Sequence, residues 1–225
     1  MQFHNINKSD KNMANDINRI GFWTALAASI ASALYSIVQL MQVAGVLKFP
    51  WDSISIYSFS LLIPVPLLIA MLALHYSVPQ EKKFFTHGAL LFTVMYATYV
   101  SLNYVVQLAT VIPNTLGRNW ESIRILDQTP HSLFWDVDAL GYISLGLATL
   151  LAFFALEKEG ISRWTRRFFL ANALMNPVIA VVYFYPTFSY ALLMLASPWL
   201  VTATGSMLFL ALYFRESGDD AGPGD

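Results

Sequence analysis

Six long apolar segments, separated by shorter polar connections, make up most of the chain. A helix needs roughly 20 apolar residues to cross the hydrocarbon core of a bilayer, and each segment approaches or exceeds that length. The pattern therefore predicts an all-α integral membrane bundle of six transmembrane helices. The expected spans are approximately residues 20–47, 54–77, 84–112, 131–156, 168–185 and 188–214.

Polar segments precede and follow the predicted six-helix domain, which covers residues 19–215. Residues 1–18 carry mixed charges and are expected to form a flexible cytoplasmic segment. Residues 216–225 are acidic and rich in glycine, which is typical of a disordered tail. The first apolar segment, from Ile20 to Leu47, is too long for a signal-peptide core of about 7–15 residues. We expect it to remain as the first transmembrane helix.

The composition supports a membrane location and excludes several classes of function. The chain is 56% hydrophobic and 12% charged, whereas soluble domains are about 25% charged. A mean hydropathy of +0.53 and a net charge of −1 predict membrane lipids as partners and argue against nucleic acid. The chain has no cysteine, which excludes disulfides, thiolate nucleophiles and cysteine-bound iron–sulfur or zinc sites. No metal and no cofactor is predicted.

Basic residues are distributed unevenly between the two ends of the predicted helices. An even number of spans places both termini on one side of the membrane, and cytoplasmic connections carry an excess of lysine and arginine. The side that holds the termini has Lys8, Lys11, Arg19, Lys82, Lys83, Lys158, Arg163, Arg166, Arg167 and Arg215, and the other side has Lys48, Arg118 and Arg124. Both termini are therefore expected to be cytoplasmic.

Polar side chains within the spans gather in the half that this topology places outside. The fourth span carries Asp138 and, one helical turn later, Tyr142. A carboxylate at membrane depth costs on the order of a few kcal/mol, so it normally faces a cavity, a protein interior or a partner. Polar residues lie at the same level in the first and third spans, which predicts an outward-facing pocket between helices 1–4. The predicted ligand-binding residues are Gln39, Gln42, Asn103, Gln107, Asp138 and Tyr142.

Asp136 lies two residues before Asp138, and the two carboxylates have different expected roles. Residues two apart on a helix point about 200° away from each other, so this pair is poorly placed to chelate one metal ion. Asp136 is expected to reach the headgroup layer. Asp138 has two interpretations: a functional group in the pocket, or a structural hydrogen-bond acceptor that joins the third and fourth helices.

Other local patterns predict how the helices pack and where they break. Ser29 and Ser32 lie on one face of the first span, where small residues allow a second helix to approach closely. Pro64 and Pro66 lack the N–H group that a helix requires and predict a kink in the second span. Residues 119–126 predict a short helix in the headgroup region or over the pocket.

Three segments of the chain resemble parts of small, uncharacterised polytopic membrane proteins of bacteria. They are Asn103–Leu108 (NYVVQL), Trp135–Tyr142 (WDVDALGY) and Phe169–Asn172 (FLAN). The resemblance implies a six-helix bundle in a bacterial inner membrane. It implies no activity, because none is established for such proteins.

Three functions are compatible with these patterns. The first is the binding or transport of a small polar or amphiphilic molecule in the outward-facing pocket. The second is an intramembrane enzyme that acts on a lipid or isoprenoid, with Asp138 as general acid or base and as the candidate catalytic residue. The third is a structural or accessory subunit without a ligand. Carriers often contain two related halves, and a homodimer would supply the half that this chain does not repeat.

We predict that single cysteines introduced at Asn119 and Gln80 lie on opposite sides of the membrane. The chain has no cysteine of its own, so a membrane-impermeant maleimide applied to intact cells reports the introduced residue alone. Asn119→Cys should be modified from outside, whereas Gln80→Cys should react after the cells are opened. Labelling of position 80 with sparing of position 119 would show that the orientation is wrong.

Overall fold

A computed structural model describes residues 2–219 of the chain, and these residues form helices joined by short connections, without a strand. The elements in chain order are α1 (Gln2–Val43), α2 (Trp51–Leu61), α3 (Pro64–Ser77), η1 (Gln80–Lys82), α4 (Lys83–Val106), η2 (Gln107–Val111), α5 (Ile112–Leu116), α6 (Trp120–Ile123), η3 (Arg124–Leu126), α7 (Leu133–Ala155), α8 (Gly160–Leu174), α9 (Asn176–Phe184), α10 (Tyr190–Met194) and α11 (Pro198–Asp219).

Six helical stretches of the described chain are long and apolar enough to cross a membrane, which confirms the predicted all-α class and the presence of six long apolar helices. They are Asn12–Val43, Trp51–Ser77, Gln80–Leu116, Leu133–Ala155, Gly160–Phe184 and Tyr190–Gly218. Such a set of apolar helices indicates a multi-pass membrane protein. The short helix predicted within residues 119–126 is also present, as α6 and η3.

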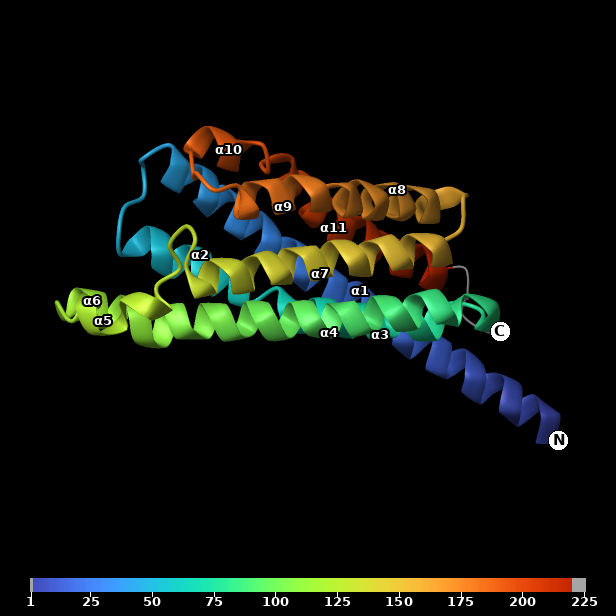
Figure 1. Cartoon of the computed structure of the whole chain (residues 1–225). Coiled ribbons are helices and arrows are strands. Elements are labelled where there is room, and N and C mark those ends of the chain that lie inside the picture. Colours follow the sequence, from blue (N-terminus) through green and yellow to red (C-terminus); the bar gives the residue numbers. More distant parts are fainter. Residues whose placement is uncertain (1, 220–225) are drawn as a thin grey trace.

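The six spans form a closed ring in which each packs against its neighbours in the chain. α1 contacts α3, α3 contacts α4, α4 contacts α7, α7 contacts α8, α8 contacts α11, and α11 returns to α1. The connections 44–50, 117–132 and 185–189 lie together at one end of the bundle, here called the long-loop end (Figure 1). The first span begins and the last span ends at the opposite, terminus end.

The packing seam predicted for the first span is where the ring closes. The Ser29 hydroxyl donates to the carbonyl oxygen of Thr204 (3.2 Å), and the Ser32 hydroxyl lies 2.8 Å from the Thr204 hydroxyl. Ala25 and Ala28 on the same helix face are fully buried. The small side chains bring α1 and α11 close together, so the interpretation of this face as a packing seam is confirmed.

Prolines interrupt three spans of the described chain. The predicted kink in the second span is confirmed, because α2 ends at Leu61 and α3 begins at Pro64. In the fifth span α8 gives way to α9 just before Pro177, and in the sixth α10 and α11 are separated by residues 195–197 before Pro198. A proline cannot donate to the carbonyl four residues earlier, so each break lies where that bond is lost.

Several boundaries differ from the predicted ones. α1 begins at Gln2, so residues 2–18 continue the first helix instead of forming a flexible segment. It ends at Val43, although apolar residues continue to Leu47, because Gly45 has φ +70° and the Gly45 and Val46 N–H groups bond to the carbonyls of Gln42 and Met41. This is a Schellman motif, which stops a helix whatever the hydropathy of the next residues.

The ends of the last two spans also differ. The fifth span starts at Gly160 rather than 168, because the arginines that follow still fit a helix: the Arg166 guanidinium lies 4.1 Å from the centre of the Phe153 ring and donates to the Phe153 carbonyl. The sixth begins at Tyr190 rather than 188, and α11 continues to Asp219. The remainder of the predicted tail, residues 220–225, lies outside the described residues.

We predict that Gly146→Ala destabilises the bundle more than Gly88→Ala does. A Cβ atom at Gly146 would lie 1.9 Å from the Asn176 side-chain oxygen, whereas one at Gly88 would meet the flexible end of Leu151 at 2.9 Å. Overpacking of this kind typically costs about 1–3 kcal/mol. Thermal melting of both variants in the same detergent measures the difference. Equal melting temperatures would contradict the close α7–α9 contact.

Candidate functional site

Asp138 is the buried carboxylate around which the polar side chains of the long-loop end are arranged. Its helix, α7, begins after Ser132, whose hydroxyl accepts a hydrogen bond from the Trp135 N–H (3.2 Å). This cap places Asp138 in the second turn, where it faces α4 and α9 and is 2% exposed. Asp136 is exposed on a different side of the same helix. The two carboxylates therefore point apart, as their spacing predicts.

Three neutral donors satisfy the Asp138 carboxylate. Oδ1 accepts from the Tyr104 hydroxyl (3.0 Å) and the Asn103 amide (3.2 Å), and Oδ2 accepts from the Tyr183 hydroxyl (2.6 Å). Tyr104 and Asn103 come from α4, and Tyr183 comes from α9. Hydrogen bonds to an ionised group are stronger than those between neutral groups, so the carboxylate joins three helices. Lys82–Glu157, at the terminus end, is the one ion pair among residues 12–218. No basic side chain in this range therefore pairs with Asp138.

Amide side chains extend the hydrogen-bond network from Asp138 to the connection between α4 and α7. Asn103 also donates to the Gln128 side-chain oxygen (3.0 Å). Gln107 donates to the Leu126 carbonyl (2.8 Å) and accepts from the Gln128 N–H (3.2 Å). Gln107 begins η2, a π-helical turn that precedes Pro113. Such turns often mark functional sites, and this one aims Gln107 at the loop instead of continuing the regular helix.

Gln39 and Gln42 belong to a separate hydrogen-bond chain, centred on Asp52. The Tyr35 hydroxyl donates to Gln39 (3.3 Å), the Gln39 amide to Gln42 (3.0 Å), and the Gln42 amide to the Asp52 carboxylate (2.9 Å). Asp52 is 9% exposed and also accepts from the N–H and hydroxyl groups of Ser53. This chain ties the long-loop end of α1 to the start of α2.

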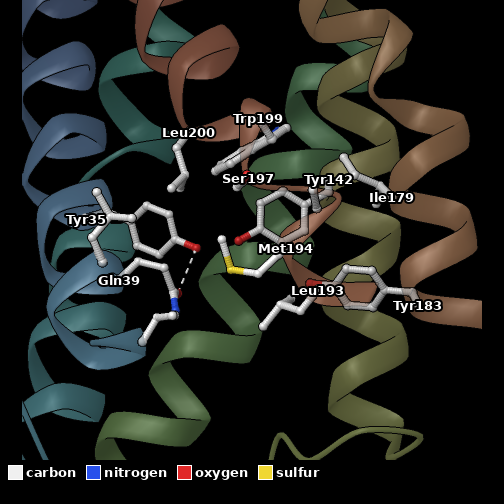
Figure 2. A pocket seen from close by; sticks show the side chains of 13 residues that line it. Tyr35, Gln39, Tyr142, Ile179, Tyr183, Leu193, Met194, Ser197, Trp199 and Leu200 are labelled. Atoms are coloured by element: carbon white, nitrogen blue, oxygen red, sulfur yellow. Dashed lines mark hydrogen bonds between the residues drawn. The ribbon is translucent and has the colours of Figure 1, made fainter. Parts of the chain in front are cut away.

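A cavity lies between these two networks, with Leu40, Val43 and Met194 at its exposed side (Figure 2). Its walls come from α1, α7, α9, α10 and the start of α11, that is, from spans 1, 4, 5 and 6. The cavity has a volume of about 100 Å³, which is room for several water-sized groups. Most of the wall is apolar or aromatic and none of it is charged. The polar side chains in the wall are Tyr35, Gln39, Tyr142, Tyr183, Ser197 and Trp199.

Two phenols connect the cavity to the buried carboxylate. Tyr183 forms part of the wall and donates directly to Asp138. The Tyr142 hydroxyl lies 3.3 Å from that of Tyr104, which itself donates to Asp138. In Figure 2 the hydroxyl groups of Tyr35 and Tyr142 point toward each other across the cavity. Tyr183 therefore links a molecule in the cavity to Asp138 through one further hydrogen bond, and Tyr142 does so through two.

Trp199 contributes an unsatisfied donor to this region. The side chain is 6% exposed, and its indole N–H has no hydrogen-bond partner. A buried N–H without an acceptor costs about 1–3 kcal/mol.

The predicted residues divide into two groups in the structure. The first, around the buried carboxylate, consists of Asn103, Gln107, Asp138 and Tyr142. The second, in the Asp52 chain, consists of Gln39 and Gln42, and Gln39 faces Tyr142 from across the cavity. Gln42 is directed to Asp52. The cavity itself is lined by Gln39 and Tyr142 but not by Asn103, Gln107 or Asp138.

Sequence reasoning missed most of the phenols. Tyr183 continues a face of the fifth span that begins with Asn172 and Asn176, at spacings of four and then seven, and this periodicity is a signal that identifies it. Tyr104 follows Tyr96 at a spacing of eight, two turns along one face. Trp199 and Ser197 carry no such signal, because Ser197 lies in the break between α10 and α11 and Trp199 lies in the first turn after it.

Comparison of the chain with protein-family models, with curated proteins and with solved structures found no match.

We predict that Asp138→Asn keeps the fold whereas Asp138→Ala weakens it. The asparagine oxygen can accept from Tyr104 and Asn103, and its amide can donate to Tyr183, whose hydroxyl turns to accept. The change in unfolding free energy should be about 1 kcal/mol or less. Alanine leaves three buried donors without an acceptor and should cost more than about 2 kcal/mol.

Melting in detergent compares these variants with Asp136→Asn, the exposed control, which should match the parent. An Asp138→Asn protein as unstable as Asp138→Ala would show that the bundle needs the negative charge itself and not merely an acceptor.

Proposed function

We propose that this chain is a membrane protein of a bacterial inner membrane, with both termini cytoplasmic, that binds or transports a small amphiphilic molecule. The observation that carries the proposal is the largely apolar cavity whose few polar groups are phenols hydrogen-bonded to a buried carboxylate. Ligand sites are typically concave and apolar with a small number of polar groups that fix orientation. The apolar wall would hold a hydrocarbon part, and the phenols would hold a polar head.

The construction of the cavity wall favours a protein that admits a ligand. One side is formed by α1 and α7, which are continuous helices, and the other by α9, α10 and the start of α11, which lie beside breaks. Half-helices can tilt at such breaks without loss of their internal hydrogen bonds, as hinges require. The 195–197 turn, which contributes Ser197 to the wall, is the natural point of movement.

The position of Asp138 gives the enzymatic alternative less support. A general acid or base must lie within hydrogen-bond reach of the atom it serves, or act through one water. Asp138 does not line the cavity, and the Tyr183 and Tyr104 hydroxyls occupy its oxygens. A carboxylate in this position is better suited to orient phenols and to set the charge of the site. A subunit without any ligand leaves the cavity without a role.

We predict that an amphiphile bound in the cavity protects Ser197→Cys from a thiol reagent. Serine to cysteine preserves the shape, and the chain supplies no competing thiol. The probes are octylammonium, 1-octanol and octanoate, each added to protein in the same maltoside detergent before a methanethiosulfonate reagent. At least one probe should slow modification of position 197 by about tenfold.

Two controls accompany this test. The rate at the exposed Gln80→Cys position, at the terminus end, should not change. Ala196→Phe, which fills the cavity beside Ser197, should remove the protection, whereas Val201→Phe, 66% exposed before substitution, should retain it. If none of the three probes protects position 197, the proposed function is wrong.

A further inference from the structure

In the phenol hydrogen bonds around Asp138, every donated hydrogen is directed toward the carboxylate. A carboxylate is an acceptor only, so Tyr183 and Tyr104 each use their single hydroxyl hydrogen on Asp138. The hydroxyl of Tyr104 then has lone pairs but no hydrogen for its neighbour, so Tyr142 is the donor in the 3.3 Å contact between them. The hydrogens of all three phenols are thus directed away from the cavity and toward the carboxylate.

The phenol on the opposite wall of the cavity has also already used its hydrogen. The Tyr35 hydroxyl donates its hydrogen to the Gln39 side-chain oxygen (3.3 Å). What Tyr35, Tyr142 and Tyr183 present to a ligand is therefore oxygen lone pairs. A head group that donates hydrogen bonds fits these three acceptors, whereas one that only accepts has no phenol hydrogen to receive.

The charge of the site points to the same class of ligand. Asp138 is 2% exposed, and among the described residues no basic side chain contacts it. A buried charge without a counter-charge is costly, and a cation placed nearby would lower that cost. The cavity wall contains no charged side chain that could supply the cation or repel one. The missing counter-charge is therefore available to a ligand.

Aromatic rings from four spans pack together in the cavity wall. The centre of the Trp199 ring lies 4.6 Å from the centre of the Tyr142 ring and 6.1 Å from that of the Tyr35 ring. The centres of the Tyr142 and Tyr183 rings are 6.1 Å apart. Aromatic faces attract ammonium groups, most strongly where water is excluded. The indole N–H does not oppose this, because it lies in the ring plane and the attraction is at the ring face.

We propose that the cavity selects amphiphiles with a positively charged ammonium head, which donates hydrogen bonds to the phenols and balances the charge of Asp138. This rests on the proposed function and identifies its ligand class. A hydrocarbon part of the ligand would lie against the apolar wall formed by residues such as Ile179, Leu193 and Leu200.

The three eight-carbon probes separate this proposal from the proposed function. Octylammonium, 1-octanol and octanoate have the same chain and differ in the charge of the head group at pH 7. The proposal expects octylammonium to protect Ser197→Cys at a concentration about tenfold lower than octanol, and octanoate to protect least. That ratio corresponds to about 1.4 kcal/mol, within the range of a desolvated cation–aromatic contact.

Adding Asp138→Asn to the Ser197→Cys protein tests the source of the preference and corrects for partitioning into the micelle. The preference for octylammonium over octanol should disappear while protection by octanol persists. Equal protection by octylammonium and octanol in the parent, or a preference for octanoate, would overturn the charge selection and leave the proposed function intact. A preference that survives Asp138→Asn unchanged would overturn the role of the carboxylate.

The ranking of probes in the parent decides the proposal even if the Asp138→Asn protein does not fold. Ala196→Cys, at the next position of the cavity wall, provides a second reporter in which the same ranking is required. Octylammonium must again protect at the lowest concentration, and any other order at this position contradicts the proposal.

Discussion

The structure depends on a carboxylate that is buried without a basic partner. Removing such a group from water is costly, and the cost is met here by three neutral donors whose positions must be accurate to within a hydrogen bond. Because the donors come from α4 and α9, Asp138 sets the spacing and rotation of both helices relative to α7. The π-helical turn at Gln107 and the 124–128 connection serve the same carboxylate, because Gln107 and Gln128 bond to Asn103 and hold it in place.

The features that could be predicted from the sequence follow from local chemistry. Six apolar stretches of sufficient length can form little other than six helices, and Pro64 must break the helix that contains it. Asp138, Asn103 and Gln107 were predicted as a group because an intramembrane carboxylate needs polar partners at the same depth. The small residues Ser29 and Ser32 indicated a packing seam for a similar reason, since close approach requires short side chains.

The features that could not be predicted depend on which spans meet. Gln39 and Gln42 lie at the depth of Asp138, but depth does not determine the direction of a side chain around the ring, and Asp52 is a nearer acceptor. The cavity requires the first span to contact the last, a closure that no local pattern encodes. Tyr35 and Trp199 become neighbours only through that closure. Gly45 likewise overrides hydropathy, because a left-handed residue ends a helix regardless of the apolar residues beyond it.

Tyr183 both lines the cavity and bonds to Asp138, so a movement of its side chain also changes the hydrogen bonding of the buried carboxylate. An outward shift of α9 at the break before Pro177 would separate the Tyr183 hydroxyl from the carboxylate. The loss of a hydrogen bond to a charged group costs about 1.5–3 kcal/mol, or roughly ten- to a hundredfold in an equilibrium constant. The width of the cavity between α7 and α9 is thus held by the strength of one buried bond and not by the packing of its apolar wall alone.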